Sequence, residues 1–329
     1  MPLFGVFLFL LSACSDEPLE SFKLSGTTMG TSYHITVVGQ ASDASQLSQR
    51  IDFRLALLNQ QMSTYIEKSE LSRFNQLPPG EWQAVSPELF QVLLLSTEIS
   101  WLTNGSFDIT VGPLVDLWGF GPQHTDNIPS TEAIKSQLAS IGFQHLEFNL
   151  QGSRISKSKP VRLDLSAIAK GYGVDIIAKL LRSEGHQNFM VEIGGELYLS
   201  GLSPRNTPWR IAIEQPNSDS ISVHRAINIS NKAVATSGDY HNYVERDGVR
   251  YSHTIDPTTG RPVTHSLASV TVIDDDVATA DALATAITVM GAEAGMALAK
   301  QQNLAIYLIN KTEQGFDSQY SDAFKPYLD

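Results

Sequence analysis

Apolar residues recur along the chain at two different spacings, and these spacings predict a mixture of helices and strands. Between Ile51 and Met62 they lie three or four residues apart, as on one face of a helix. Between Phe22 and Val38, β-branched and aromatic residues surround a glycine-containing turn, as in a pair of strands. Further helices are predicted over Ser86–Asn104, Thr131–Ile141, Ala167–Ser183, Ala278–Met290 and Ala292–Lys300. Further strands are predicted over Leu146–Leu150, Val161–Leu165, Phe189–Ile193, Glu196–Leu199, Trp209–Glu214, Ala226–Ile229, Ala268–Ile273 and Leu304–Ile309.

The order of these elements indicates the fold class. Helices and strands do not alternate regularly, and several strands follow one another across short turns. This order favours an α+β fold of mixed, largely antiparallel sheets packed with helices over a doubly wound parallel fold. No internal repeat and no long linker divides the 329 residues, and the candidate motifs interleave along the chain. The sequence therefore predicts a single catalytic unit.

Composition and charge narrow the classes of partner. An apolar fraction of 42% is ordinary for a globular protein and excludes wholesale disorder. The 35 acidic and 23 basic residues give a formal net charge of −12, which disfavours nucleic acid and anionic membrane surfaces as main partners. Because Cys14 is the single cysteine, neither a disulfide framework nor a cysteine-based zinc site is possible.

The first residues have the features of an export signal. Residues 2–13 form an apolar run that is shorter than the roughly 20 residues needed to span a bilayer. The run ends in Leu-Ser-Ala-Cys14, which resembles the bacterial lipobox, whose cysteine is lipidated and becomes the mature N-terminus. We therefore expect a signal peptide over residues 1–13 and a lipidated Cys14. A tether over residues 14–21 then leads to the catalytic unit over 22–329. The alternative is a buried N-terminal strand with an incidental free thiol.

Two segments carry groups suited to a phosphate and a cation. A predicted strand delivers Asp164 to the start of a predicted helix, where free backbone N–H groups favour phosphate and Lys170 adds a positive charge. Asp281 and Thr285 are four residues apart on another predicted helix, so their oxygens share one face and suit Mg²⁺. For the first segment, the alternative is a capping aspartate with a solvated lysine. For the second, it is an aspartate that only interacts with the helix dipole.

Aromatic and glycine-rich segments indicate a site for a flat ring and a proton carrier. Tyr65 follows a predicted helix and is placed to stack on a ring, the alternative being an aromatic that covers the helix end. Phe107 and Asp108, among glycines, suit a heteroaromatic ring with a polar edge, the alternative being a capped turn. His253 precedes a Pro-Thr-Thr-Gly turn and is placed like a general acid or base, although a lone histidine is more often structural. The loop 26–31 is either a ligand-binding loop or a plain hairpin.

In this order the segments resemble the ApbE family of FAD:protein FMN transferases. The resemblance extends from about residue 26 to residue 290, nearly the whole chain after the signal. It implies an ApbE-like, T-fold-like arrangement of the α+β unit. The matching blocks are Gly26–Tyr33, Met62–Tyr65, Ser69–Asn75, Phe107–Thr110, Leu163–Tyr172, Ile193–Glu196, Ser237–Tyr240, Ser252–Pro257 and Ala280–Ala286.

The resemblance also implies roles for individual residues. It assigns Mg²⁺ to Asp281, Thr285 and the backbone oxygen of Ala167. It matches His253 to a histidine that assists the transfer. The positions that match FAD-contacting residues, some through their backbone, are Met29, Tyr65, Ser106, Phe107, Asp108, Asp164, Lys170 and Ile255.

The implied reaction joins FMN through its phosphate to a Thr or Ser hydroxyl of an acceptor protein and releases AMP. FAD is then the substrate and Mg²⁺ the cofactor. The implied acceptors resemble NqrC- and RnfG-type subunits of redox pumps. Family habit places such a lipoprotein on the periplasmic face of the inner membrane, with the outer membrane as the alternative. Two rival functions stay open, namely hydrolysis of FAD to FMN and AMP, and flavin binding without catalysis.

Overall fold

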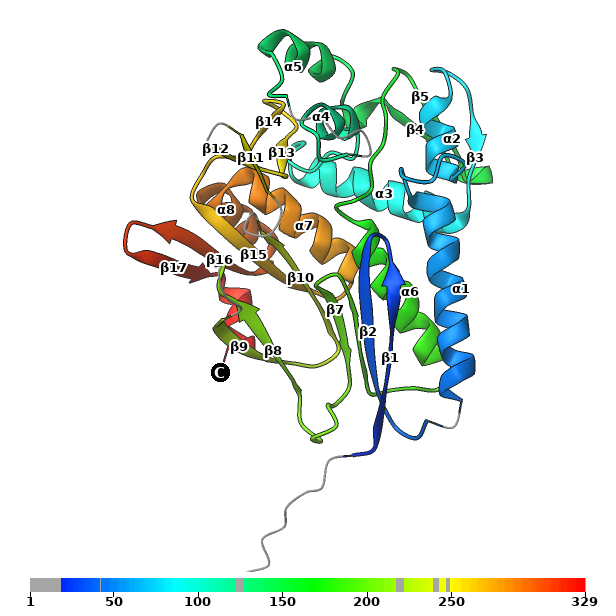
Figure 1. The fold of residues 1–329 in the computed structure, drawn as a ribbon, viewed down its shortest axis with the longest axis vertical. Coiled ribbons are helices and arrows are strands. Elements are labelled where there is room, and N and C mark those ends of the chain that lie inside the picture. Colours follow the sequence, from blue (N-terminus) through cyan, green and yellow to red (C-terminus); the bar gives the residue numbers. More distant parts are fainter. Residues whose placement is uncertain are drawn as a thin grey trace, which may run out of the picture.

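The computed structural model describes residues 19–41, 43–121, 127–216, 222–238, 243–246 and 249–328 (Figure 1). Cys14, the predicted signal peptide and most of the predicted tether lie outside these residues. Within them, every helix is too short or too polar to cross a bilayer.

An antiparallel sheet of eight strands forms the centre of the fold, in the order β1-β2-β6-β7-β10-β15-β16-β17. Every neighbouring pair in it is antiparallel, which confirms the predicted α+β class. The predicted hairpin at the start of the chain forms β1 and β2, at one edge of the sheet. The strands span Ser21–Thr28 (β1), Thr31–Val38 (β2), Phe189–Ile193 (β6), Glu196–Ser200 (β7), Lys232–Gly238 (β10), Leu267–Asp274 (β15), Ala305–Thr312 (β16) and Gly315–Tyr320 (β17).

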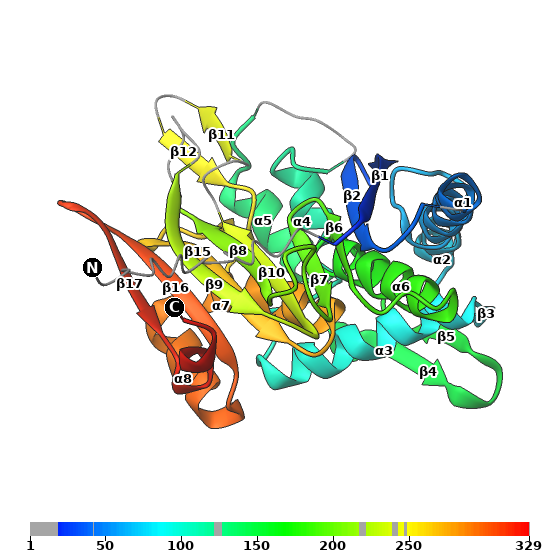
Figure 2. The ribbon, with the colours of Figure 1, turned by 90° about the horizontal axis from the view of Figure 1, so that it is seen from below.

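Helices cover one face of this sheet and bury the larger apolar core. Helix α7 packs on β10 and β15, α6 packs on β6 and β7, and α1 packs on β1. The apolar positions between Ile51 and Met62 face this core, as their spacing predicts. Figures 1 and 2 show α1, α6 and α7 following one another along the sheet. The helices span Ala44–Met62 (α1), Pro87–Leu102 (α3), Ala169–Ser183 (α6), Val277–Met290 (α7) and Ala292–Gln302 (α8).

A second, smaller apolar cluster lies at the β10-β15-β16 part of the sheet. It joins these strands to the hairpin β8–β9 and the 3₁₀ helix η3, with Trp209, Tyr307 and Phe324 among its buried members. A third, small apolar cluster has Leu114, Trp118, Ile134 and Ile255 as its buried members. The remaining elements are short and lie within or around these three clusters. They are Glu70–Gln76 (α2), Gln83–Ala84 (β3), Gly112–Leu117 (α4), Thr131–Leu138 (α5), Phe143–His145 (η1), Leu146–Asn149 (β4), Leu150–Gly152 (η2), Arg154–Lys157 (β5), Trp209–Glu214 (β8), Val223–Ile229 (β9), Tyr243–Arg246 (β11), Val249–Ser252 (β12), Ile255–Asp256 (β13), Arg261–Pro262 (β14) and Asp322–Tyr327 (η3).

The prediction of a strand over Val161–Leu165 was wrong. The strand that pairs with β4 is instead β5. The side chain of Asn75 forms both hydrogen bonds of the Leu163 backbone. Its amide NH₂ group donates to the Leu163 carbonyl at 2.9 Å, and its amide oxygen accepts the Leu163 N–H at 2.7 Å. The remaining backbone pairing of this segment is an isolated parallel bridge between Arg162 and Val111, which is too short to form a strand. Helix α6 also begins two residues later than predicted, at Ala169.

The backbone of α6 at Gly171 lies against the backbone at the start of α7, and this contact sets how closely the two helices approach. A Cβ atom at Gly171 of α6 would lie 2.5 Å from the carbonyl oxygen of Val277, so only glycine fits there. One turn further along α6, the Asp175 carboxylate accepts the N–H groups of Val277 at 2.9 Å and of Ala278 at 3.0 Å. It thereby caps the start of α7 from a neighbouring helix. Burial raises the pKa of Asp175 to about 6, although these two hydrogen bonds oppose the rise.

We expect Gly171→Ala to lower the free energy of unfolding by roughly 1–3 kcal/mol, because the new methyl group meets backbone that cannot move aside without separating α6 from α7. Gly173→Ala is the matched control two residues away. There the new methyl group meets the ends of the Met29 and Ile193 side chains at 3.2 and 3.3 Å, which can shift. Urea unfolding of the two variants checks this, and equal stability of both would contradict the proposed constraint.

Candidate active site

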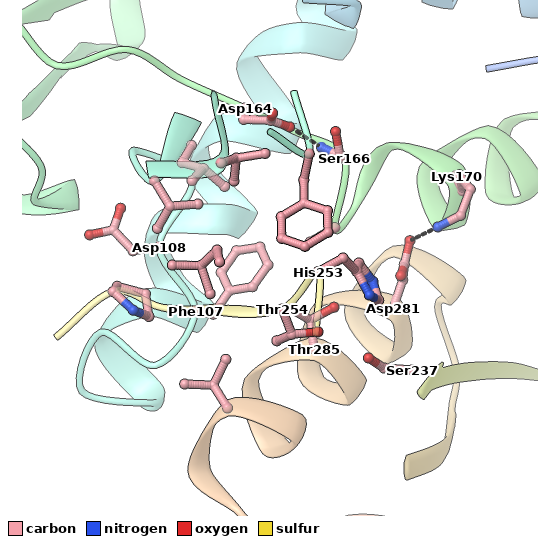
Figure 3. Close-up of a pocket in the computed structure, with 18 of the residues that line it drawn as sticks. Phe107, Asp108, Asp164, Ser166, Lys170, Ser237, His253, Thr254, Asp281 and Thr285 are labelled. Atoms are coloured by element: carbon pink, nitrogen blue, oxygen red, sulfur yellow. Dashed lines mark hydrogen bonds and ion pairs between the residues drawn. The ribbon is translucent and has the colours of Figure 1, made fainter. Parts of the chain in front are cut away.

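A cavity of about 670 Å³ lies beside α7, within the size range of small-molecule sites. Its walls come from segments far apart in the sequence, from Tyr65 to Val289. The structure thus brings together residues that the sequence analysis found in five separate segments (Figure 3). The predicted site residues that line it are Tyr65, Ser106, Phe107, Asp108, Asp164, Ala167, Lys170, His253, Ile255, Asp281 and Thr285.

Among the described residues, Met29 is the predicted ligand contact that does not line the cavity. It lies in the turn between β1 and β2 with a φ of 48°, and its methyl end approaches Gly173 of α6. Thr31, on the other side of the same turn, lies next to Gly194, which does line the cavity. The turn therefore supports the cavity wall, and the structure gives Met29 a packing role.

One part of the cavity is apolar and suits a flat ring. Phe107, which is 2% exposed, lines it together with Phe120 and Ile255. Tyr65 lies at the edge of the cavity and is 67% exposed. Its partial burial and the negative charge of Asp164 raise the pKa of Tyr65. Aromatic side chains in such a position hold a ring by stacking or edge contacts.

Asp108 caps its own turn, as the alternative prediction for this segment had it. One carboxylate oxygen accepts the backbone N–H and the hydroxyl of Thr110, at 2.8 and 2.7 Å. The other oxygen accepts the N–H of Phe143 at 3.0 Å. Burial raises the pKa of Asp108, and these hydrogen bonds oppose the rise. The carboxylate thus joins the loop that carries Phe107 to the segment after α5.

Asp164 organises the approach to α6. Its Oδ1 accepts the N–H of Ser166 at 2.7 Å, which forms a turn before the helix. Because of this turn, α6 begins at Ala169 and not at Ala167 as predicted. Ala167 precedes the helix and lines the cavity. Lys170 follows in the first turn of the helix and extends toward α7 (Figure 3).

Lys170 lies between two buried carboxylates. Its Nζ is 3.1 Å from Glu196 and 3.8 Å from Asp281, whose Oδ2 also accepts the N–H of Gly171 at 3.1 Å. The Lys170 side chain is 27% exposed, whereas those of Glu196 and Asp281 are 4% and 7% exposed. Burial works against the charge of Lys170, but the two carboxylates outweigh it and raise the pKa of the lysine. Burial also raises the pKa values of Glu196 and Asp281, against the opposing charge of Lys170.

Glu196 ends the family block Ile193–Glu196, and the sequence alone indicates no role for it. The residue follows two glycines with positive φ, Gly194 at 57° and Gly195 at 102°, which turn the chain sharply between β6 and β7. That turn points a carboxylate into the protein at the first position of a strand whose other residues are mostly apolar. A charged residue at the start of a buried strand is the one signal in the sequence that indicates this position.

His253 belongs to a segment that is fixed by aromatic contacts. The Trp118 indole N–H donates to the carbonyl of Gly260 at 2.8 Å, and the Trp118 ring lies 5.5 Å from that of Tyr251. Phe120 meets the His253 ring edge-on, with 6.4 Å between ring centres. Figure 3 shows the His253 side chain beside Asp281, with Thr285 and Ser237 close by. The imidazole therefore shares one end of the cavity with the charged cluster.

The charged end of the cavity fits a divalent cation such as Mg²⁺. Lys170 provides one positive charge against two carboxylates, and Glu196 Oε2 is buried without a hydrogen-bond partner among the described residues. A buried excess of negative charge is relieved when a cation binds. Asp281, Thr285 and Ala167 all line the cavity, and their carboxylate, hydroxyl and carbonyl oxygens are of the hard type that Mg²⁺ prefers. This set has only one carboxylate and no histidine or cysteine. No group of three or more His, Cys, Asp or Glu side chains that could hold a metal ion occurs in the described part of the chain.

The chain is similar to known proteins over nearly its whole length. The model of the ApbE family matches residues 29–308. A Vibrio cholerae protein named FAD:protein FMN transferase is 49% identical over 325 residues, which cover 98% of this chain and 96% of that protein.

Solved structures are similar over most of the chain as well. The flavin transferase ApbE from Vibrio cholerae has a TM-score of 0.88 at 47% identity and covers 94% of this chain and 100% of its own. The apo form of the Pseudomonas stutzeri flavinyl transferase ApbE has a TM-score of 0.87 at 38% identity, and the match covers 94% of this chain and 97% of that one. Because the match extends over nearly the whole chain in both sequence and fold, the chain belongs to the ApbE family.

Proposed function

We propose that the protein transfers the FMN moiety of FAD to a Thr or Ser hydroxyl of an acceptor protein, with release of AMP. The observation that carries this proposal is the division of one cavity into an apolar part for a ring and a charged part for phosphate. The names of the similar proteins from Vibrio cholerae and Pseudomonas stutzeri support it. Phe107 and Tyr65 would hold a ring of FAD while its diphosphate lies near Lys170.

The charged end of the cavity stabilises the diphosphate during transfer. Lys170 keeps its ammonium charge beside two carboxylates and offers it to the phosphate oxygens. Mg²⁺ bound by Asp281, Thr285 and the carbonyl of Ala167 would supply Lewis-acid polarisation of these oxygens. Because the cluster is largely shielded from water, these charges act more strongly than they would in solution.

His253 is placed to remove the proton from the acceptor hydroxyl. The hydroxyl oxygen attacks the phosphorus of the FMN moiety and forms a phosphoester bond, while His253 takes the hydroxyl proton. The bond from this phosphorus to the bridging oxygen breaks, and AMP leaves with that oxygen and both bonding electrons. Edge contact with Phe120 limits the orientations of the imidazole ring, so the basic nitrogen keeps its direction.

The acceptors and the location are part of the same proposal. Acceptors resembling NqrC- and RnfG-type redox-pump subunits suit an enzyme of this kind. A lipid anchor at Cys14 would hold the catalytic unit at the periplasmic face of a membrane, where such subunits would be reached by a tethered enzyme. The lipobox-like sequence before Cys14 supports the anchor.

The proposed function is tested by mixing the purified protein, FAD, Mg²⁺ and an NqrC-type acceptor domain. We expect in-gel flavin fluorescence on the acceptor, lost when its modified threonine is replaced by alanine. Release of FMN and AMP at an equal rate without acceptor would instead identify an FAD pyrophosphatase. FAD that stays bound and intact with Mg²⁺ present would identify a flavin-binding protein.

We expect Asp281→Ala to reduce Mg²⁺-dependent transfer by about 10²–10³-fold, because it removes the carboxylate ligand next to the reacting phosphate. Binding of FAD, measured by fluorescence quenching, should change much less, since the ring contacts with Phe107 and Tyr65 remain. Asp276→Ala is the matched control, because Asp276 is exposed at the start of the same helix and lies outside the cavity. Transfer by Asp281→Ala at the control rate would exclude the proposed metal site.

We expect Cys14→Ser to abolish incorporation of labelled palmitate and to release the protein from the membrane fraction of cells. The physical reason is that a thioether-linked lipid needs the cysteine sulfur, and the acyl chains provide the membrane affinity. Labelling and fractionation of the wild-type chain and the variant check this. Equal membrane association of both would contradict the anchor, while transfer activity of the purified variant should be unchanged.

A further inference from the structure

Glu196 is a buried carboxylate that the proposed transfer mechanism leaves without a task. Its side chain is 4% exposed, it lines the cavity, and its Oε1 forms an ion pair of 3.1 Å with Lys170. Its Oε2 has no hydrogen-bond partner within the described residues. Burial of a carboxylate costs free energy of desolvation, which the ion pair with Lys170 offsets. The role of Glu196 is therefore tied to that of the lysine.

The lysine has two possible partners and is nearer to one of them. The distance from Lys170 Nζ to Glu196 is 3.1 Å, within hydrogen-bonding range, whereas the distance to Asp281 is 3.8 Å, beyond that range. Asp281 Oδ2 already accepts the N–H of Gly171. If Lys170 moved fully onto Asp281, it would cancel the charge of this carboxylate and compete with any cation for its oxygens.

We propose that Glu196 is a positioning residue that holds the Lys170 ammonium away from Asp281 and so keeps the Asp281 carboxylate available to a divalent cation. This inference rests on the proposed function, in which Asp281 is a ligand of that cation. It assigns the two carboxylates different tasks. Glu196 pairs with the lysine, and Asp281 keeps its negative charge for the metal.

The backbone around Gly194 supports this division. A Cβ atom at Gly194 would lie 3.2 Å from Cδ of Lys170 and 2.9 Å from Cγ2 of Thr31. The stem of the lysine therefore passes directly over this glycine, next to Thr31 of the β1–β2 hairpin. The same tight turn places Glu196 two residues later, where its carboxylate meets the end of that stem. The chain thus fixes both members of the pair with one turn.

Binding of Mn²⁺ tests the proposal without a measurement of activity. Mn²⁺ takes the same oxygen ligands as Mg²⁺, and its free ion is counted by electron paramagnetic resonance. We expect Glu196→Gln to weaken Mn²⁺ binding by about 10-fold or more, as for other changes next to a metal ligand, because the released lysine pairs with Asp281. Lys170→Met removes the competing ammonium and should tighten Mn²⁺ binding.

The double variant separates this mechanism from direct action on the metal. When Glu196→Gln is added to Lys170→Met, the affinity for Mn²⁺ should change by less than about threefold, because no lysine remains to be held. An equal loss from Glu196→Gln in both backgrounds would overturn the proposal, since Glu196 would then act on the cation itself. An unchanged affinity of the single variant would overturn it as well.

Controls separate folding and general charge effects from positioning. Glu184→Gln removes one negative charge from another ion pair, with Arg50 at 2.7 Å, outside the cavity, and should leave Mn²⁺ binding unchanged. Glu196→Asp keeps the charge and should restore part of the affinity, and thermal unfolding of each variant reports its stability. If the wild-type chain binds Mn²⁺ no better than Asp281→Ala, the proposed metal site fails and this inference fails with it. If only the Glu196 variants behave like the wild type, the metal site stands and the inference alone is overturned.

Discussion

The close contact between α6 and α7 is the constraint on which the rest of the site depends. Lys170 is carried by α6 and Asp281 by α7, so their separation is decided by how near the two helices approach. Gly171 allows the approach because it has no side chain, and its N–H binds the Asp281 carboxylate directly. Asp175 then caps α7 from the same face of α6. Helix α6 therefore makes three contacts with α7: the close packing at Gly171, the cap formed by Asp175 and the charge of Lys170 near Asp281. All three require the same approach of the two helices.

The charged cluster shows how a protein with a net charge of −12 can bind an anionic substrate. The overall charge acts at a distance and is screened by salt, whereas Lys170 acts at the cavity wall beside partly buried groups. Two buried carboxylates keep the lysine charged, and they leave an excess of negative charge that the proposed divalent cation would neutralise. The positive potential at this end of the cavity therefore depends on Lys170 and on the two carboxylates that keep it charged.

The fold was largely predictable because its helices each bury one face and most of its central strands are apolar. The spacing between Ile51 and Met62 identified α1, and the branched residues of β15 and β16 identified buried strands. Strand β10 was missed because its residues are small and carry no clear alternation, and β17 was missed because it is a polar edge strand. The supposed strand over 161–165 does not form, because the Asn75 side chain pairs with the backbone of Leu163 and the segment otherwise makes only an isolated bridge to Val111. All of the residues that the family resemblance assigned to the site, except Met29, line one cavity. The pairing of Glu196 with Lys170 is a long-range contact that no local pattern contains.

The separation of the cavity walls along the chain has a consequence for folding. Groups between Tyr65 and Val289 meet only after the β10–β15 pairing and the α6–α7 contact have formed. Contacts between such distant residues carry a large loop-closure cost and form late. A fragment that lacks one of these segments therefore lacks part of the cavity wall, and a partly folded chain in which α6 and α7 have not met lacks the Lys170–Asp281 pair.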